Sequence, residues 1–504
     1  MYFAGYQMIK EGRLMSGSYR ILLILIFIPF FGSSQNYQAV HGSSYAGSLG
    51  VTNNPASIVH VPYSWDLTLF SVQARHSSNA VVINNLSLLK PSSNTRIDAV
   101  QGSNKYFLMA NQDARILNGR IRLNEESAIA FGAAIRSGQS FNTGMVSWID
   151  TISSVRQFMA DNFANSPLSA YIRGQAWAEI YGTYARRIME NENGILNAGV
   201  TLNINRGIGA AYVNSTELYL KPGQVHGQAG YILNDGKLDY GYSSNLDEWD
   251  KPGTNQELRK AFLKKTWSSI SLNLGAEYII PSEDEDYYKY DLKLGVSLLD
   301  LGFNKYQYSS NSRTAVMSLD NISDSLVQAT FEGLEATRDL PDSIAQIAGS
   351  IQQLAGYFRV FTPARLVINA DKRITGNLFI NAELTLPITS LLGQKKLYVR
   401  EMSLAALTPR FETRALGIYL PLTINTRGEV WLGAALKLGP LLAGVHNLSN
   451  VFTTNTMQHG GAYLAVNIRP FQKRDKEERT PGEKRSRGGG GRKGGRYGCP
   501  GSVL

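Results

Sequence analysis

Cysteine is almost absent from this sequence, because Cys499 is its only one. A single thiol excludes an intrachain disulfide and a thiolate metal cluster. Because Cys499 lies near the C-terminus, it is not the acylated N-terminal cysteine of a lipoprotein. Charged residues are also few, at 18%, and no long helical heptads occur along the 504 residues. One large β-domain is therefore the predicted organisation, in preference to several soluble cores.

Long hydrophobic runs are missing as well. No stretch offers about eighteen uninterrupted apolar residues, so no transmembrane helix is expected. The longest apolar run, Ile21–Phe31, follows several basic residues and precedes small residues that end at Ser34. The alternative reading, a membrane anchor, would need about twenty apolar residues. Residues 1–34 are therefore predicted to be a secretory signal peptide that is cleaved after Ser34.

Alternating strands are what the sequence does contain, most regularly from Phe361 to Phe471. Residues 415–424 and 429–438 alternate large apolar side chains with small or polar ones, as strands with two different faces do. Their length exceeds the five or six residues usual in a soluble sandwich and suits the roughly nine to eleven needed to cross a bilayer. The pattern predicts an all-β fold, a transmembrane antiparallel β-barrel over residues 65–471 with about 14–16 strands.

The first two thirds of this barrel are less regular. Two short turns are predicted in this part, at Glu125–Glu126 and at Asn191–Gly194, and a hairpin is expected to turn at Asn234–Gly236. The strands predicted here cover residues 65–74, 80–89, 115–124 and 127–136, a pair within 174–213, and residues 267–280 and 288–301.

Two long insertions interrupt the strands, at about residues 138–173 and 304–361. Apolar residues recur every three or four positions within Trp148–Phe163, which predicts a helix. Two further amphipathic helices are predicted from Leu326, Phe331 and Leu334 and from Ile344, Ile347, Ile351 and Leu354. Because barrels of this class have short periplasmic turns, both insertions are expected outside the cell, where the second would form a cap.

The segments before and after the strands differ in composition. Residues 35–64 are rich in glycine, serine and asparagine and include Asn53, Asn54 and Pro55. They are predicted to be either a hatch inside the lumen or a disordered periplasmic lead. Residues 472–504 carry ten Lys or Arg and four Asp or Glu, so 10 − 4 = 6 of the net charge of +10 lies there. This glycine-rich tail is predicted to be disordered and periplasmic, and the nearly neutral barrel argues against nucleic acid as a partner.

Charged residues at inward positions of the predicted strands are candidate lumen-lining residues. They form either a polar conduit with contacts to the hatch or, as an alternative, the paired charges that any wide barrel must hold inside. Mixed signs favour mutual pairing over an ion-selective ring. The candidates are Glu179, Glu277, Asp291, Lys293, Arg365, Asp371, Glu383, Glu429, Lys437 and Arg469.

Sites of catalysis or metal binding are not predicted. The acidic run Glu283–Asp286 lacks the spacing of a calcium loop and is read as a solvated turn. The six histidines show no metal-ligand spacing, and no nucleophile motif appears. We therefore expect no enzyme activity and no cofactor.

Residues 436–452, LKLGPLLAGVHNLSNVF, and the terminal strand GGAYLAVNIRPF resemble the end of a Bacteroidota family of outer-membrane barrels of unknown function. The leading NNPA and the stretch FTPARLVINADKRITGNLFINAELTLPI fit the same family, over roughly residues 35–471. That family is similar in architecture to the long-chain fatty-acid transporters, which hold an N-terminal hatch in the lumen. The basic tail departs from this pattern, since such barrels usually stop at the last strand.

The resemblance implies the passage or capture of a small hydrophobic ligand in the outer membrane of a Gram-negative cell. Its partners would be outer-membrane lipid and that ligand. The alternative is a structural or assembly component whose loops and tail bind other envelope proteins, such as secretion or motility machinery. A plugged lumen with a broad apolar patch on the cap would favour this alternative, whereas an apolar pocket below the cap would favour transport.

Overall fold

The computed structural model describes residues 37–85, 95–225, 228–283, 288–317, 322–332, 339–393, 396–452 and 456–470. The predicted signal peptide, the basic tail and the acidic turn after Glu283 lie outside these residues. The chain divides into one compact unit that ends at Arg469 and a second, residues 470–504, of which only Pro470 is described.

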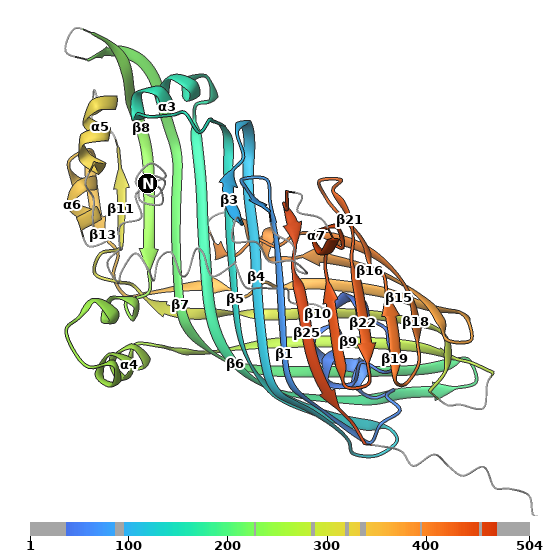
Figure 1. The fold of residues 1–504 in the computed structure, drawn as a ribbon. Helices are drawn as coiled ribbons and strands as arrows, with labels where there is room; N and C mark the ends of the chain where they lie inside the picture. The colour runs from blue at the N-terminus through green and yellow to red at the C-terminus, as the bar shows by residue number, and fades with distance from the viewer. Residues whose placement is uncertain are drawn as a thin grey trace, which may run out of the picture. The chain divides into compact units, whose positions relative to one another are not determined.

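Within the described residues, fourteen antiparallel barrel strands form one sheet that closes on itself, which confirms the predicted barrel (Figure 1). We call each barrel strand, whether continuous or interrupted, a stave. Closure occurs where β25 pairs with β1, for example through Leu464 and Val72. Two staves are interrupted, and each consists of two strands that share the same neighbours. The staves are β1 Trp65–Ser78, β4 Gly102–Arg122, β5 Ser127–Trp148, β6 Leu168–Asn191, β7 Gly194–Val225, β9 Ser268–Pro281, β10 Tyr290–Gln307, β15 Arg365–Thr375, β16 Leu378–Pro387, β18 Leu404–Glu412, β19 Leu416–Tyr419 with β20 Leu422–Asn425, β21 Val430–Leu432 with β22 Ala434–Leu438, β23 Leu441–Val445 and β25 Ala462–Ile468.

Alternation along the staves decides which side chains face outward. In β19 and β20, Ile418 and Leu422 are both 45% exposed, whereas Tyr419 and Thr423 are 0% and 2% exposed. The same alternation runs through β18, where residues of even number are buried and most residues of odd number are exposed. The outer face of this part of the barrel is therefore apolar, and the inner face is covered.

The described part of the strand predicted at residues 80–89, residues 80–85, does not belong to a stave, and residues 86–89 lie outside the described residues. Val81–Asn84 forms a short strand, β2, that pairs with β3, Arg96–Ala99, in a separate two-stranded sheet. The second stave is instead β4, which begins at Gly102, well before the predicted residue 115. A register shift between Lys105 and Phe107 and the polar residues that follow hide the alternation in its first half.

The hairpin predicted at Asn234–Gly236 is also wrong. Strand β8 runs through these residues, from Gln228 to Tyr242, and pairs with the end of β7. Two register shifts, after Thr216 and after Tyr219, let both strands pass this point. Glycine and asparagine here mark irregularities in a strand pair, which they favour as readily as a turn.

Staves β4 to β7 contain 21, 22, 24 and 32 residues, far more than the nine to eleven or so that cross a bilayer. Their far ends and β8 form an extension at the barrel end opposite the short turns, which we call the long-loop end (Figure 1). Helices α3, α5 and α6 pack on this extension through buried residues such as Met159, Leu220 and Ile344.

The predicted helices are shorter in the structure. Helix α3 spans Val155–Asn162, because β5 continues to Trp148 and Ser154 caps the helix N-terminus. Helix α5, Asp324–Phe331, covers the first part of the second predicted pattern. Helix α6 is only Leu340–Ala345, and Ile351 belongs to β13, Ser350–Gln353, which pairs with β11, Arg313–Val316.

The remaining elements lie in connections at the long-loop end. The link between β20 and β21 is short and consists of residues 426–429. The other elements of these connections are η5 Phe163–Asn165, η6 Leu246–Asp250, α4 Asn255–Lys264, β12 Ile322–Ser323, β14 Tyr357–Phe361, η8 Thr389–Leu392, β17 Leu397–Tyr398, α7 Ser449–Phe452 and β24 His459–Gly460.

The outward face makes a first prediction. Leu420, 40% exposed, lies near the middle of the stave formed by β19 and β20. If this face contacts hydrocarbon, Leu420→Arg lowers the free energy of unfolding in lipid vesicles by about 2–4 kcal/mol. Urea titration measures the loss, with Leu420→Met as the matched control. Equal stability of the arginine and methionine variants would mean that this face does not contact lipid.

Candidate functional site

A segment of the chain fills part of the lumen. Residues 37–61, which we call the hatch, form three short 3-10 helices, η2 Gln38–Val40, η3 Gly47–Thr52 and η4 Pro55–Ile58. Nearly all of them are buried. Gly42 and Gly47 have φ of +78° and +57°, so the turns before η3 use a conformation that other residues adopt at a cost.

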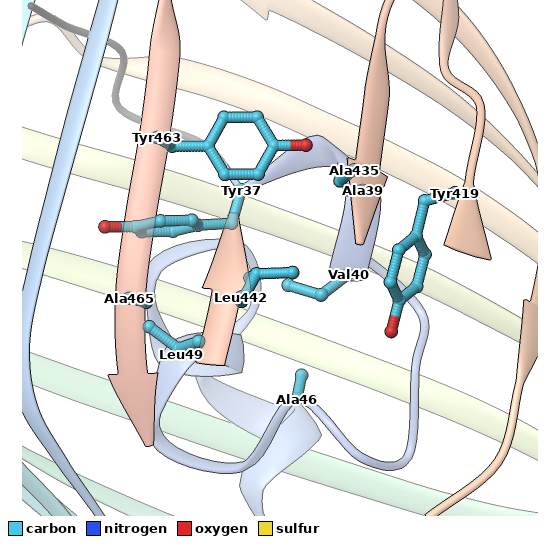
Figure 2. Close-up of a cluster of buried hydrophobic side chains, with 10 residues drawn as sticks. All are labelled: Tyr37, Ala39, Val40, Ala46, Leu49, Tyr419, Ala435, Leu442, Tyr463 and Ala465. Atoms are coloured by element: carbon cyan, nitrogen blue, oxygen red, sulfur yellow. The ribbon is translucent and has the colours of Figure 1, made fainter. Parts of the chain in front are cut away.

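One side of the hatch is apolar and lies on an apolar strip of the inner wall. Figure 2 shows Tyr37, Val40 and Leu49 of the hatch beside Leu442 and Tyr463 of β23 and β25. The rings of Tyr37 and Tyr463 meet edge to face with centroids 6.0 Å apart. The strip, which we call the apolar wall, consists of Tyr419, Ala435, Leu442, Tyr463 and Ala465.

The predicted hatch residues Asn53, Asn54 and Pro55 dock on the opposite wall. The Asn54 side chain donates to the carbonyl oxygen of Ala276 at 2.9 Å, and Ser297 Oγ donates to the Asn53 carbonyl at 2.7 Å. Two glycines make room for this contact. A Cβ at Gly275 would lie 2.1 Å from Asn54 Oδ1, and one at Gly199 would lie 2.5 Å from the Pro55 carbonyl carbon.

A buried ion pair fastens the end of the hatch. Arg120 on β4 and Asp66 on β1 are fully buried, and Arg120 Nε donates to Asp66 at 2.6 Å. Arg120 also donates to the carbonyl oxygens of Ile58 and Tyr63, and Asp66 accepts from the Ser48 backbone at 2.6 Å. Neither residue was among the predicted candidates, although both belong to predicted strands.

Several predicted lumen residues do contact the hatch. Glu383 pairs with His41 at 2.6 Å, and Lys293 donates to Ser44 Oγ at 2.7 Å. Asp371 forms an ion pair with Arg410, whose guanidinium also donates to the His41 carbonyl oxygen. Next to them, Lys437 pairs with Glu412 at 2.8 Å.

Another group of charges crosses the lumen beyond the hatch. Arg136 donates to Asp300 at 2.6 and 2.8 Å and to Glu179 at 3.1 Å. Arg365 donates to Asp300 at 2.8 Å, and Arg115 pairs with Asp113 at 2.7 Å. The cavity among these side chains has a volume of about 10 Å³, which leaves room for about one water molecule. These charged side chains therefore leave almost no free space between them and the hatch.

A second segment, which no sequence pattern predicted, enters the lumen from the long-loop end. Residues 396–403, which we call the inner loop, contain β17, lead into β18 and contact the walls formed by β4, β5 and β6. The Arg400 backbone donates to Ser140 Oγ at 3.1 Å, and Asn111 donates to the Glu401 carboxylate at 3.1 Å. Arg173 donates to the Lys396 carbonyl oxygen at 3.3 Å. Val399 is 1% exposed.

An aromatic cluster lies beside the inner loop. Phe358 on β14 stacks on Tyr306 and Tyr308, with ring centroids 5.5 and 4.6 Å away, and meets Tyr212 edge to face at 5.9 Å. The Tyr212 hydroxyl donates to Asp239 on β8 at 3.1 Å. Burial raises the pKa of Asp239, so this carboxylate takes up a proton more readily than an exposed one.

The other predicted lumen residues lie in different surroundings. Asp291 is exposed and pairs with Arg373 at 2.9 Å, and Glu429 lies at the turn after β20, 3.4 Å from His459. Arg469 follows β25 and donates to the Tyr63 hydroxyl at 2.6 Å. Glu277 is buried, and its Oε2 has no hydrogen-bond partner among the described residues.

The structure supplies two negative findings. Among the residues it describes, no group of three or more His, Cys, Asp or Glu side chains is placed to hold a metal ion. In the same residues, no helix has both the length and the apolar character that a membrane span requires.

A closed barrel with an apolar outer face and a charged, paired interior is the architecture of a bacterial outer-membrane β-barrel protein. The family described as Family of unknown function (DUF5723) matches residues 55–445, and the chain belongs to it. No curated protein matches the sequence.

Among solved structures the chain is similar to a FadL homologue from Pseudomonas aeruginosa, with 13% identity, a TM-score of 0.39 and coverage of 87% of this chain and 97% of that one. For the toluene transporter TbuX of Ralstonia pickettii the identity is 11% and the TM-score is 0.38, with coverage of 87% of this chain and 98% of that one. For the toluene transporter TodX of Pseudomonas putida the identity is 11% and the TM-score is 0.37, with coverage of 86% of this chain and 96% of that one. Alignments at these TM-scores add nothing to the barrel assignment, which rests on the strand pairing.

The docking of Asn54 makes a second prediction. Gly275→Leu forces Asn54 away from the wall and removes its bond to Ala276, which contributes about 1 kcal/mol. Amide hydrogen exchange in residues 38–58 should then be about five-fold faster. The control is Gly182→Leu on β6, where a Cβ would meet nothing within 4 Å. Unchanged exchange in Gly275→Leu would show that the hatch is not held at this wall.

The buried ion pair between Arg120 and Asp66 makes a third prediction. Arg120→Met leaves Asp66 charged and buried, so the free energy of unfolding should fall by about 3–5 kcal/mol. Equilibrium unfolding measures this loss. The control, Arg186→Met, removes a partner of an exposed ion pair with Glu126 and should leave the transition midpoint unchanged. Equal effects of the two substitutions would contradict the role given to Arg120.

Proposed function

We propose that this protein is an outer-membrane channel that admits a small hydrophobic ligand and that the described conformation is its closed state. The observation that carries the proposal is the apolar wall. Tyr419, Leu442 and Tyr463 face inward among many polar residues of the wall, and the apolar side of the hatch packs on them. Once the hatch moves, an apolar ligand has a surface to follow through the lumen.

The hatch and the inner loop, the two segments that fill the lumen, can both be displaced without breaking a covalent bond. The hatch and the inner loop are held in the lumen by hydrogen bonds, ion pairs and apolar contacts, each of which contributes only modestly to the free energy of folding. Their displacement breaks no strand pair between neighbouring staves, because none of the barrel closure depends on them. A ligand would first meet the aromatic cluster around Phe358, whose rings suit an apolar molecule.

The barrel of this channel has one orientation in the outer membrane. The short turns face the periplasm, as in barrels of this class, and the insertions with α3, α5 and α6 face the outside. The basic tail, residues 472–504, is assigned to the periplasm. No catalytic step is assigned to the chain.

A second candidate function is a structural or assembly component of an envelope complex. It is favoured by the small space, about 10 Å³, between the hatch and the charged side chains around Asp300, which admits no ligand as it stands. The helices packed on the long-loop extension would then offer the binding surface for other envelope proteins.

A reversible cross-link separates these two candidates and makes the fourth prediction. A Cβ placed on Gly138 would lie 3.6 Å from the Cβ of Val399, within the range of about 3.5–4.5 Å that a disulfide needs. Gly138→Cys with Val399→Cys, in a Cys499→Ser background, should lock the inner loop to β5 when oxidised. Cells that carry the locked protein should take up the hydrophobic dye N-phenylnaphthylamine no faster than cells without it, and reduction should restore uptake.

The two single-cysteine variants are the matched controls, and both should take up dye at the parental rate with or without oxidant. Dye uptake that is equal in the locked, reduced and absent protein would contradict the channel and favour the scaffold. Uptake that persists in the locked form, above that of cells without the protein, would mean that the ligand path avoids the inner loop.

A further inference from the structure

The outer wall of the barrel has an apolar hollow. It measures about 850 Å³ and extends over β7, β9, β10, β15, β16, β18, β20 and β21. Its lining consists mainly of outward-facing apolar residues, among them Leu294, Ile368, Leu384 and Leu407, which are 39–44% exposed. A convex barrel surface would not enclose such a volume, so this part of the wall is concave toward the membrane.

Strand register explains where the hollow is deepest. Leu294 on β10 pairs with Ala370 on β15, Ala370 pairs with Ala382 on β16, and Ala382 pairs with Leu407 on β18. Two alanines therefore lie side by side between two leucines in one row of outward positions. The alanines form the floor of the hollow, and the larger side chains form its sides.

A single cation lies at the edge of this floor. Lys372 follows Ala370 by two residues on β15, so it points outward and falls in the next row toward the short turns, between Leu292 and Ile380. Its side chain is exposed and makes no ion pair or hydrogen bond to another described residue. The turn at Gly376 is only four residues away, which puts Lys372 close to the short-turn end of the barrel.

We propose that this hollow binds an acyl chain of an anionic phospholipid from the periplasmic leaflet, with the phosphate of its headgroup at Lys372. Hydrocarbon surrounds the outward face of a membrane barrel, so an acyl chain fills the hollow without any partner surface of matching shape. Lys372 lies at the level where a headgroup of that leaflet begins, and its charge selects an anionic one. This site is separate from the lumen and does not depend on ligand passage, but its assignment to the periplasmic leaflet rests on the orientation given under the proposed function.

The test is a measurement of lipid binding to the full chain. Delipidated protein in detergent is mixed with phosphatidylglycerol or phosphatidylethanolamine, and bound lipid is counted by native mass spectrometry. We expect one phosphatidylglycerol to be retained in preference to phosphatidylethanolamine. Ala370→Trp with Ala382→Trp should abolish this adduct by filling the floor, and Lys372→Gln should remove the preference between the two lipids.

Ala443→Trp is the matched control, because Ala443 faces outward on β23, away from the hollow, and should leave binding unchanged. Unfolding midpoints of all variants should stay at the parental value, so that lost binding does not reflect lost folding. Retention of the adduct in the double tryptophan variant would overturn the site, and an unchanged preference in Lys372→Gln would overturn the headgroup assignment. A dimer of the parental chain that the double tryptophan variant loses would overturn the lipid in favour of a second copy.

Discussion

The hydrogen-bonded closure between β25 and β1 is the constraint on which the rest of this structure depends. Hydrocarbon offers no partner for a backbone N–H or C=O, so a sheet can cross a membrane only if it has no edge. Fourteen staves satisfy this requirement, but they also enclose a lumen too wide to be filled by side chains of the staves alone. The hatch and the inner loop fill space in the lumen that the side chains of the staves leave open.

Electrostatics then decides how the lumen is filled. A buried charge is costly unless it is paired and hydrogen-bonded, and the inward faces of the staves carry many. Some find partners on staves across the lumen, as Arg136 of β5 does with Asp300 of β10, whereas Glu383 and Lys293 find them on the hatch. The wall and the hatch therefore stabilise each other.

Much of this arrangement could be predicted from the sequence where alternation is unbroken. Alternation identified the staves from β15 onward and placed Lys293, Asp371 and Glu383 on the lumen side, where the structure has them. Arg410 obeys the same alternation and was available to the same reasoning. Arg120 and Asp300 were not, because a register shift between Ile116 and Gly119 precedes Arg120 and because Asp300 lies at a register shift with φ of +58°. Shifts within β4 and β7 likewise concealed their true lengths, and nothing local in residues 396–403 indicates a fold into the lumen.

The ion pairs between hatch and wall have a consequence for hydration. If His41 and Ser44 leave, Glu383 and Lys293 lose the partners that offset their desolvation. A lumen emptied of the hatch cannot stay dry around such groups, since only water or ions can replace the lost partners. Displacement of the hatch and wetting of the pore interior are thus one event, and an apolar solute would travel beside a file of water along the charged wall.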